Sequence, residues 1–270
     1  MIDVVKWALE EDIGSGDITS ALCVDADAIA GGRFIARQEM ILSGSTLLPL
    51  IYEARGGVGQ LDLLTSDGQR LKSGDVIAAV RGRARTLLEC ERVALNFMQR
   101  LSGVATLAEK FAEAVAGTKC RILDTRKTTP GLRTLEKAAA AAGGAANHRM
   151  GLYDAVLIKN NHIVAAGGVR AALERCKNAS VRVEIEVQTW QELEEALACG
   201  AKHLLLDNLT PAEAAKWVAH IARRATTEIS GGVTLETVGD YAQAGADFIS
   251  AGAITHSAVA VDINFRLAWR

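Results

Sequence analysis

The chain has 270 residues, 49% of them hydrophobic, with a net charge of -2 and a pI of about 6.2. This length supports one or two domains with a sizeable core, and the charge does not favour a nucleic-acid or membrane partner. Five scattered cysteines without a CxxC or Cys/His cluster do not predict a zinc site, and without a secretion signal they favour a reducing cytoplasm.

The first part of the chain predicts a small domain. Residues 1–11 have the pattern of a short amphipathic helix, and a Gly-containing turn follows at residues 13–17. Residues 31–37 and 75–82 are short, β-like and punctuated by glycine. We therefore expect a small antiparallel sheet in this region.

The apolar period becomes helical from about Leu87 to Val115, and the pair Ser102-Gly103 is predicted to divide this segment into two helices. No run in the sequence approaches the roughly 18 to 20 apolar residues that span a membrane. Residues 261–270 are predicted to form a short helical tail.

Six apolar runs follow Gly117, and each stops at a charged or hydroxyl residue. The runs are 122–123, 156–158, 183–185, 204–206, 228–229 and 248–249. Helix-like stretches separate most of them, which is typical of a parallel β/α barrel with its site at the carboxyl ends of the strands. A full barrel has eight strands, so we expect an incomplete one. The predicted domains are 1–104, an α+β sandwich-like domain, 105–258, the six-stranded α/β barrel, and 259–270, a tail packing back on the first domain.

Two basic loops stand beside the first barrel strands. Arg126 and Lys127 lie between hydroxyl residues and suit a carboxylate or phosphate, because Arg can form a bidentate pair while Lys acts as a mobile point charge. His148 and Arg149 follow two glycines that should end a helix. The alternative for the first loop is a solvated loop with a helix cap. The alternative for the second is a structural histidine and an exposed arginine that serves solubility.

Lys159 ends an apolar strand, where a cation is costly unless an anion meets it. It suits binding of a substrate charge or formation of a Schiff base. Alternatively, it extends to the solvent at the rim of the barrel.

Glu184 and Glu186 face the same side of one strand because they lie two residues apart. Glu186 and Asp207 end neighbouring strands and are suited to holding Mg²⁺ through oxygen ligands. They could equally pair with Lys127 and Lys159.

The last two strands end in the glycine-containing turns Ser230-Gly231-Gly232 and Gly252-Ala253. Barrels of this type commonly bind phosphate at this place through backbone N–H groups. Glycine also ends strands for steric reasons alone, so each turn by itself is a weak signal.

Together these motifs resemble the quinolinate phosphoribosyltransferases (nicotinate-nucleotide pyrophosphorylases, carboxylating) over nearly the whole chain. The matching segments are Glu11–Thr19, Glu91–Asn96, Leu101–Thr106, Asp124–Arg133, Asn147–Asp154, Leu157–Ile163, Leu206–Asn208 and Thr255–Ser257. The resemblance implies an N-terminal sandwich-like domain, an incomplete α/β barrel and an obligate homodimer, with a hexamer as a further assembly. It also implies transfer of phosphoribosyl from phosphoribosyl pyrophosphate to quinolinate in NAD biosynthesis, with Mg²⁺ as cofactor.

The resemblance further implies roles for individual residues. The two carboxylates of quinolinate would be held by Arg126, His148, Arg149 and Lys159, with Arg92 reaching the same ligand from the neighbouring subunit. Phosphoribosyl pyrophosphate and Mg²⁺ would be handled by Lys127, Glu186 and Asp207. The 5′-phosphate would be surrounded by Ser230, Gly231, Gly252 and His256.

One position departs from the family pattern, which usually has three glycines before Asn-His-Arg, whereas Ala145 follows Gly143-Gly144 here. Two other functions remain open from the residues. A Schiff-base aldolase would use Lys159, and a non-catalytic anion-binding protein would resemble the ModD molybdenum-transport-associated proteins, which lack the Asn-His-Arg and Ile-Lys-Asn-Asn-His combination.

Overall fold

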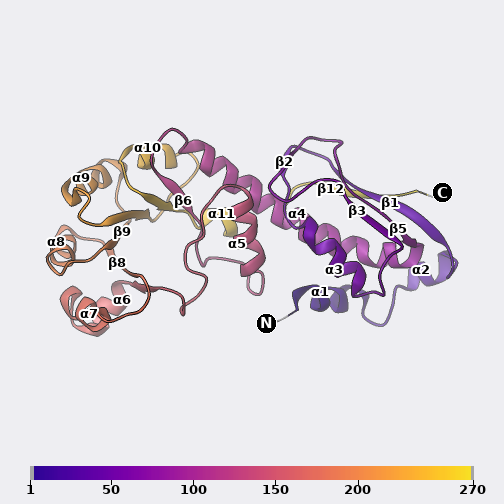
Figure 1. The fold of residues 1–270 in the computed structure, drawn as a ribbon, viewed down its shortest axis with the longest axis horizontal. Helices are drawn as coiled ribbons and strands as arrows, with labels where there is room; N and C mark the ends of the chain where they lie inside the picture. Colours follow the sequence, from indigo (N-terminus) through magenta and orange to yellow (C-terminus); the bar gives the residue numbers. More distant parts are fainter. Residues whose placement is uncertain (1–2, 269–270) are drawn as a thin grey trace. The chain divides into compact units, whose positions relative to one another are not determined.

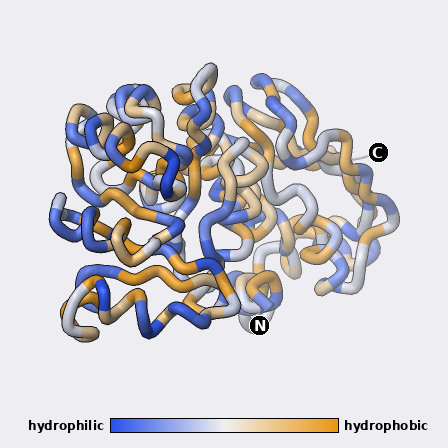
Figure 2. The backbone as a smooth tube through the Cα atoms, turned by 60° about the vertical axis from the view of Figure 1, so that its left-hand side comes forward, coloured by the Kyte–Doolittle hydropathy of each residue, from blue (hydrophilic) through white to orange (hydrophobic). Residues whose placement is uncertain are grey.

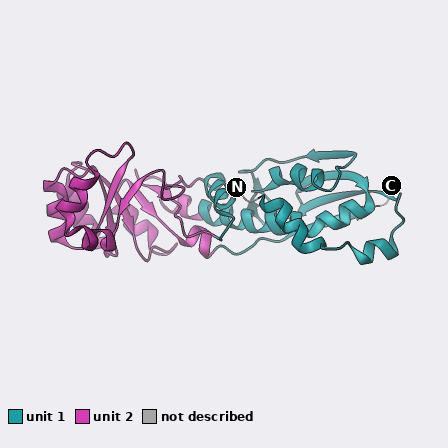
Figure 3. Cartoon of the chain, turned by 90° about the horizontal axis from the view of Figure 1, so that it is seen from below, with its two compact units in different colours: residues 1–109, 129–143, 258–270 teal, residues 110–128, 144–257 magenta. Residues whose placement is uncertain are grey.

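The computed structural model describes residues 3–268, and the chain divides into two compact units (Figure 3). Unit 1 comprises residues 1–109, 129–143 and 258–270, and unit 2 comprises residues 110–128 and 144–257. This division differs from the boundaries expected from the sequence, which placed residues 129–143 in the barrel. In the structure this segment belongs to unit 1, so unit 1 is assembled from three separate stretches of chain.

Unit 1 contains an antiparallel sheet whose described strands follow the order β12-β1-β5-β3, and a separate pair, β2-β4. Its strands are β1 (Ile29–Ala36), β2 (Met40–Ile41), β3 (Gln60–Leu63), β4 (Arg70–Leu71), β5 (Val76–Arg83) and β12 (Ile263–Ala268). Its helices are α1 (Val4–Ile13), α2 (Ile18–Cys23), the 3-10 helix η1 (Ser45–Leu47), α3 (Leu48–Glu53) and α5 (Arg133–Ala142). Strand β1 alternates between buried and more exposed residues, as expected for a sheet with one face on the core.

The antiparallel sheet predicted from residues 31–37 and 75–82 is confirmed by the pairing of β1 with β5. The predicted N-terminal helix corresponds to α1, whose N-cap Asp3 accepts a hydrogen bond from the backbone N–H of Lys6. Residues 1–2, which the prediction also included, lie outside the described residues.

The prediction of a helical tail is wrong for residues 263–268, which form β12 and pair antiparallel with β1. Gly32 and Phe265 show why the strand fits. A Cβ at Gly32 would overlap the Phe265 ring, so the glycine makes room for this aromatic side chain on the sheet. Residues 269–270 of the predicted tail lie outside the described residues.

Helix α4 (Ala84–Ala114) runs without interruption through the Ser102-Gly103 pair, so the prediction of two helices is wrong. Glycine is required at position 103 because the backbone of another segment passes close to the helix there. A Cβ at this position would collide with the carbonyl group of Val259. The glycine therefore leaves space for the backbone that crosses the helix. The helix tolerates it although glycine is about 1 kcal/mol less favourable than alanine in a helix interior.

Unit 2 is built on a parallel sheet whose described strands follow the order β6-β11-β10-β9-β8-β7, which confirms the six strands expected from the sequence. The strands are β6 (Arg121–Leu123), β7 (Val156–Ile158), β8 (Val183–Val187), β9 (His203–Asp207), β10 (Thr226–Ser230) and β11 (Phe248–Ser250). The helices are α6 (Asn160–Ala166), α7 (Val169–Cys176), α8 (Trp190–Ala198), α9 (Pro211–Ile221), α10 (Val238–Gln243) and α11 (Ala253–His256).

Helices α7, α8 and α9 lie on the outer side of the unit 2 sheet (Figure 1). Along them the chain alternates between hydrophobic and hydrophilic residues, as an amphipathic helix on a sheet requires (Figure 2). Capping boxes begin two of them, from Thr189 to Glu192 and from Thr210 to Glu213. These caps define the residue at which each helix begins. They thereby set the length of the loop between the helix and the preceding strand. No helix in the described part of the chain is long and apolar enough to cross a membrane.

A buried ion pair in unit 1 joins α4 to α5. The Glu136 side chain is fully buried and accepts hydrogen bonds from Arg100 Nη2 at 2.7 Å and from Thr129 Oγ1 at 2.7 Å. The backbone N–H of Thr129 also donates to Glu136, at 3.0 Å. The segment before α5 is thus anchored by one carboxylate.

We predict that Glu136→Ala lowers the free energy of unfolding by about 3 kcal/mol, because it leaves Arg100 and the Thr129 donors without their buried acceptor. Urea denaturation at a fixed protein concentration measures this. The control is Glu39→Ala, which removes an exposed partner of Arg70 and should cost less than about 1 kcal/mol. Equal losses in both variants would contradict the role given to Glu136.

Candidate active site

A cavity of about 810 Å³ opens at the carboxyl ends of the unit 2 strands. Parallel strands bring all their carboxyl ends to the same edge, so side chains far apart in sequence meet there. The predicted site residues that line it are Arg126, Lys127, His148, Arg149, Lys159, Glu186, Asp207, Ser230, Gly231, Gly252 and His256. Arg92 lies in unit 1, exposed on α4, and does not line this cavity.

The segment before His148 runs alongside β6. Ala146 forms a parallel bridge with Leu123, and the N–H of Asp124 donates to the carbonyl of Ala146 at 3.0 Å. The buried Asp124 side chain accepts the backbone N–H of His148 at 2.8 Å. His148 and Arg149 are therefore fixed at the free edge of β6.

Ala145, the departure from the family's third glycine, fits this segment. It is buried and does not belong to the non-glycine residues with positive φ in the described chain, which are Asn208, Ala222 and Arg223. Gly144 does have a positive φ, of 92°. The turn therefore needs glycine at position 144, and an alanine at 145 costs no backbone strain.

Both ring nitrogens of His148 are engaged within the protein. Nδ1 accepts the backbone N–H of Arg149 at 2.7 Å, so the ring proton lies on Nε2. Nε2 stands 3.5 Å from the carboxylates of Glu184 and Glu228. These three side chains bring polar atoms within 4.8 Å of one another, but Nε2 carries the ring proton and has no lone pair for a metal ion. Arg182 already supplies positive charge to Glu184, at 3.2 Å.

Two guanidinium groups crowd together in this cavity. Burial lowers the pKa of Arg149, and the nearby charge of Arg126 lowers it further, while Asp154 and Glu184 oppose the shift. The Arg149 Nη1 atom donates to the carbonyl of Ala155 at 3.0 Å, which orients the side chain. Like charges held this close favour an anion that can neutralise them.

Lys127 lies against the last turn of the unit. A Cβ at Gly252 would come within 2.7 Å of Lys127 Cδ, so a larger residue there would require the lysine side chain to move. The Thr255 hydroxyl donates to the carbonyl oxygen of Lys127 at 2.7 Å. The two predicted site elements, the basic loop and the second glycine turn, thus depend on each other.

The first glycine turn is locked to the end of β9. Gly231 has a φ of 96°, and a Cβ there would overlap the side chain of Asn208. Asn208 itself has a φ of 58°, a conformation that asparagine tolerates, and its N–H donates to the carbonyl of Ser230 at 2.9 Å. The backbone at Ser230 and Gly231 is therefore held open to the cavity.

The carboxylates at the ends of β8 and β9 are linked by one amide. Glu186 Oε2 pairs with Lys159 Nζ at 2.7 Å, as one of the sequence-based alternatives predicted. Gln188 Nε2 donates to Asp207 Oδ2 at 2.9 Å and stands 3.5 Å from Glu186 Oε1. Neighbouring carboxylate oxygens without sulfur or nitrogen ligands fit a hard cation such as Mg²⁺.

Lys159 does not have the surroundings of an imine-forming lysine. Such a residue needs an apolar pocket or a second cation against it. Its side chain is 47% exposed and pairs with a carboxylate. The geometry disfavours the aldolase alternative.

The sequence-based reasoning missed several lining residues, among them Thr125, Gln188, Thr234, Ser250 and Glu228. Glu228 could have been found, since it lies two residues before Ser230 and so faces the same side of β10. No sequence signal distinguishes Gln188 from a solvent-exposed residue after a strand.

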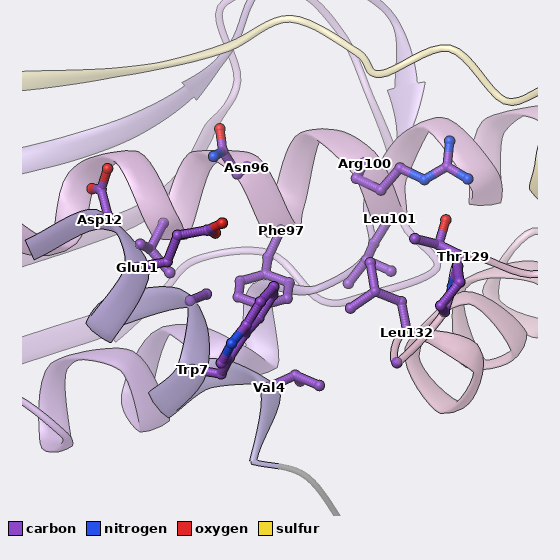
Figure 4. A pocket seen from close by; sticks show the side chains of 14 residues that line it. Val4, Trp7, Glu11, Asp12, Asn96, Phe97, Arg100, Leu101, Thr129 and Leu132 are labelled. Carbon is purple, nitrogen blue, oxygen red and sulfur yellow. The ribbon is translucent and has the colours of Figure 1, made fainter. Parts of the chain in front are cut away.

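Unit 1 has a second cavity, of about 680 Å³, whose lining includes Trp7, Phe97 and several aliphatic side chains (Figure 4). It is lined by residues of α1, α4 and the 129–132 loop. Its surface is mostly apolar and lacks the convergent cations of the unit 2 cavity. It is therefore a poor site for an anionic substrate.

Comparison with known proteins identifies both halves of the chain. Residues 17–102 match the N-terminal domain, and residues 104–266 the C-terminal domain, of quinolinate phosphoribosyl transferase. The "probable nicotinate-nucleotide pyrophosphorylase [carboxylating]" of Bacillus subtilis is 39% identical over 257 residues, covering 94% of this chain and 89% of that protein. The corresponding protein of Mycobacterium leprae is 39% identical and covers 98% of this chain and 96% of its own length.

The crystal structure of nicotinate-nucleotide pyrophosphorylase from Ehrlichia chaffeensis superposes with a TM-score of 0.94 at 33% identity, covering 98% of each chain. The likeness therefore extends over both units in sequence and in fold. The chain belongs to the quinolinate phosphoribosyltransferase family.

Proposed function

We propose that this chain transfers the phosphoribosyl group of phosphoribosyl pyrophosphate to quinolinate with decarboxylation. The products are nicotinate mononucleotide, pyrophosphate and CO₂, and the reaction belongs to the de novo biosynthesis of NAD. The chain's relatives carry this activity in their names. Five cysteines without a disulfide in the described residues support a cytoplasmic location.

The observation that carries the proposal is the set of cations in one cavity. Arg126, Lys127, Arg149 and Lys159 all line it, and the carboxylates and glycine turns stand on the same rim. An anion-binding accessory protein of the ModD type would share some of these cations. It would have no use for a paired carboxylate site beside them.

The reaction needs positioning more than a nucleophilic side chain. The pyridine nitrogen attacks C1 of the ribose while pyrophosphate leaves. Arg126, Arg149 and Lys159 would hold the dicarboxylate in line with that carbon, and proximity supplies much of the rate. His148 would shape the pocket with its ring, since both of its nitrogens are engaged inside the protein.

The pyrophosphate end of the second substrate would lie toward Lys127 and the carboxylates. Glu186 and Asp207 would hold Mg²⁺, which neutralises charge on the departing pyrophosphate. Lys127 would act on the same oxygens as a mobile point charge. The 5′-phosphate would lie against the backbone of Ser230, Gly231 and Gly252, with His256 beside it.

The site would be completed by a second copy of the chain, with the protein acting as a homodimer. Arg92 is exposed on α4 and is not among the residues that line the cavity of unit 2, so it is available to a neighbouring subunit. The dicarboxylate would then face one more cation, Arg92 of the neighbouring subunit. A hexamer would be a further assembly of such dimers.

The test of the function is incubation of the purified protein with quinolinate, phosphoribosyl pyrophosphate and Mg²⁺, following pyrophosphate and CO₂ together. Equal release of both, dependent on quinolinate, is the expected result. Binding of quinolinate without release of either product would replace the proposal with the ModD-like alternative.

We predict that Arg149→Ala weakens quinolinate binding by roughly 10- to 150-fold, because a charged hydrogen bond contributes about 1.5–3 kcal/mol. Isothermal titration calorimetry measures the dissociation constant. The matched control is Arg170→Ala, an exposed arginine of unit 2 outside the cavity. Unchanged affinity in the Arg149 variant would remove this residue from the substrate site.

We predict that Asp207→Asn raises the Mg²⁺ concentration needed for half-maximal turnover by at least about tenfold, because an amide oxygen is a weaker ligand than a carboxylate. Titration of pyrophosphate release with Mg²⁺ measures this. Asp240→Asn, on the exposed surface of α10, is the control. An unaltered titration in the Asp207 variant would argue against the metal site.

We predict that two inactive variants, Arg92→Ala and Lys159→Ala, recover part of the activity when mixed, since mixed dimers contain one intact site. Activity is assayed after subunit exchange has been verified by mass spectrometry. Mixing each variant with itself is the control. No recovery in verified mixed dimers would count against a site shared between subunits.

A further inference from the structure

The cavity of unit 2 contains one acid that the mechanism above does not use. Glu228, on β10, is almost completely buried and still lines the cavity. Its Oε1 atom has no hydrogen-bond partner among the described residues. A buried polar atom without a partner is rare and costly, so its retention calls for an explanation.

The other cavity carboxylates are already engaged. Glu186 pairs with Lys159, and Asp207 accepts hydrogen bonds from Gln188 and Asn208 at 2.9 and 2.7 Å. The unpartnered oxygen of Glu228 thus distinguishes it from the two residues assigned to Mg²⁺. Glu228 is thus a buried carboxyl group of the cavity lining with one oxygen atom, Oε1, that no described residue engages.

The neighbours of Glu228 keep a proton on it. His148 offers a single N–H, on Nε2, to two carboxyl groups, those of Glu184 and Glu228. Two buried carboxylates so close together cannot both ionise easily, and the pair retains one proton. Arg182, at 3.2 Å from Glu184, stabilises the charged form of Glu184 and leaves the proton to Glu228.

The titration of the pair agrees with this geometry. Burial raises the pKa of Glu228 to about 7, and the charge of Glu184 adds to the shift. Interactions with His148, Ser250 and Arg182 oppose it. Burial also acts on Glu184, but His148 and Arg182 outweigh it and leave its pKa below the ordinary value.

The proposed reaction requires a proton at C2 of the pyridine ring. When the bond between ring carbon C2 and its carboxylate breaks, the electron pair stays on C2 and CO₂ departs. The nicotinate product carries hydrogen at C2, so one proton must be delivered there. Arginine remains protonated in proteins and does not give up its proton. Arg126 and Arg149 are therefore excluded as the general acid.

Building on the proposed function, we propose that Glu228 is the general acid that protonates C2 of the pyridine ring after CO₂ has left. The O–H bond of the Glu228 carboxyl group breaks, its proton forms the new C–H bond with the electron pair on C2, and a carboxylate remains. A proton from water restores the acid after the product leaves. Glu184 and His148 act as positioning residues, because they hold the proton on Glu228.

The test is Glu228→Gln, which preserves size and removes the acidic proton. Formation of nicotinate mononucleotide should fall by about 100-fold or more, the usual contribution of general acid catalysis. The quinolinate dissociation constant should stay within about threefold. In the wild type, turnover at saturating substrate should decline as pH rises through a value at or above about 7, because the acid loses its proton, and the variant should lack this decline.

A second readout separates chemistry from structure. In an equal mixture of H₂O and D₂O, the ratio of hydrogen to deuterium at C2 of the product depends on the proton donor, and should differ between the wild type and Glu228→Gln. Glu228→Asp, which keeps an acid, should recover part of the rate. Glu174→Gln, an exposed residue on α7, is the matched control and should behave as the wild type.

Three outcomes overturn the proposal: a rate within threefold of the wild type, an unchanged pH profile, or an unchanged isotope ratio at C2. An unchanged ratio would transfer the role to another donor such as Lys127. A failure of the proposed function can be distinguished from these outcomes. In that case the wild-type protein would release neither pyrophosphate nor CO₂ when incubated with both substrates.

Discussion

The site depends on the convergence of like charges at one edge of a parallel sheet. Two guanidinium groups and two ammonium groups line a single cavity, and the pKa of Arg149 is lowered partly by Arg126. Such a cluster destabilises the protein without a ligand and is relieved by an anion with several charges. Glu186 offsets part of the charge of Lys159, and the net positive charge of the cluster is left for the substrates.

Two glycines leave space for neighbouring side chains at the rim of this cavity. Gly252 leaves space for the stem of Lys127, and Gly231 avoids the side chain of Asn208. A larger residue at position 252 would displace Lys127, and one at position 231 would overlap Asn208. Each glycine is therefore required by a neighbouring side chain and not by its own strand. The sequence marked these glycines as phosphate-binding candidates, and the structure adds a steric reason for them.

Sequence periodicity predicted the repeated βα elements and the antiparallel strand pair correctly. It failed where a single contact between distant residues determines the local structure. Six parallel strands and the antiparallel pair β1-β5 followed from periodicity. Gly103 was read as a helix break, although it admits the backbone of Val259, and residues 263–268 were read as helix, although they complete a sheet. Neither partner is near in sequence, so local propensity could not reveal it. Within the site, Glu228 was missed because its significance lies in its burial beside Glu184 and His148.

The pairing of β12 with β1 has a consequence for the order of folding. Strand β1 leaves the ribosome before every strand of the unit 2 sheet, and β12 leaves after all of them. Domains generally fold as units while synthesis proceeds from the N-terminus. Here the first-made sheet must wait for residues 263–268 to cover the edge of β1, while every strand of the unit 2 sheet has already emerged. The sheet of unit 1 is therefore completed after the sheet of unit 2.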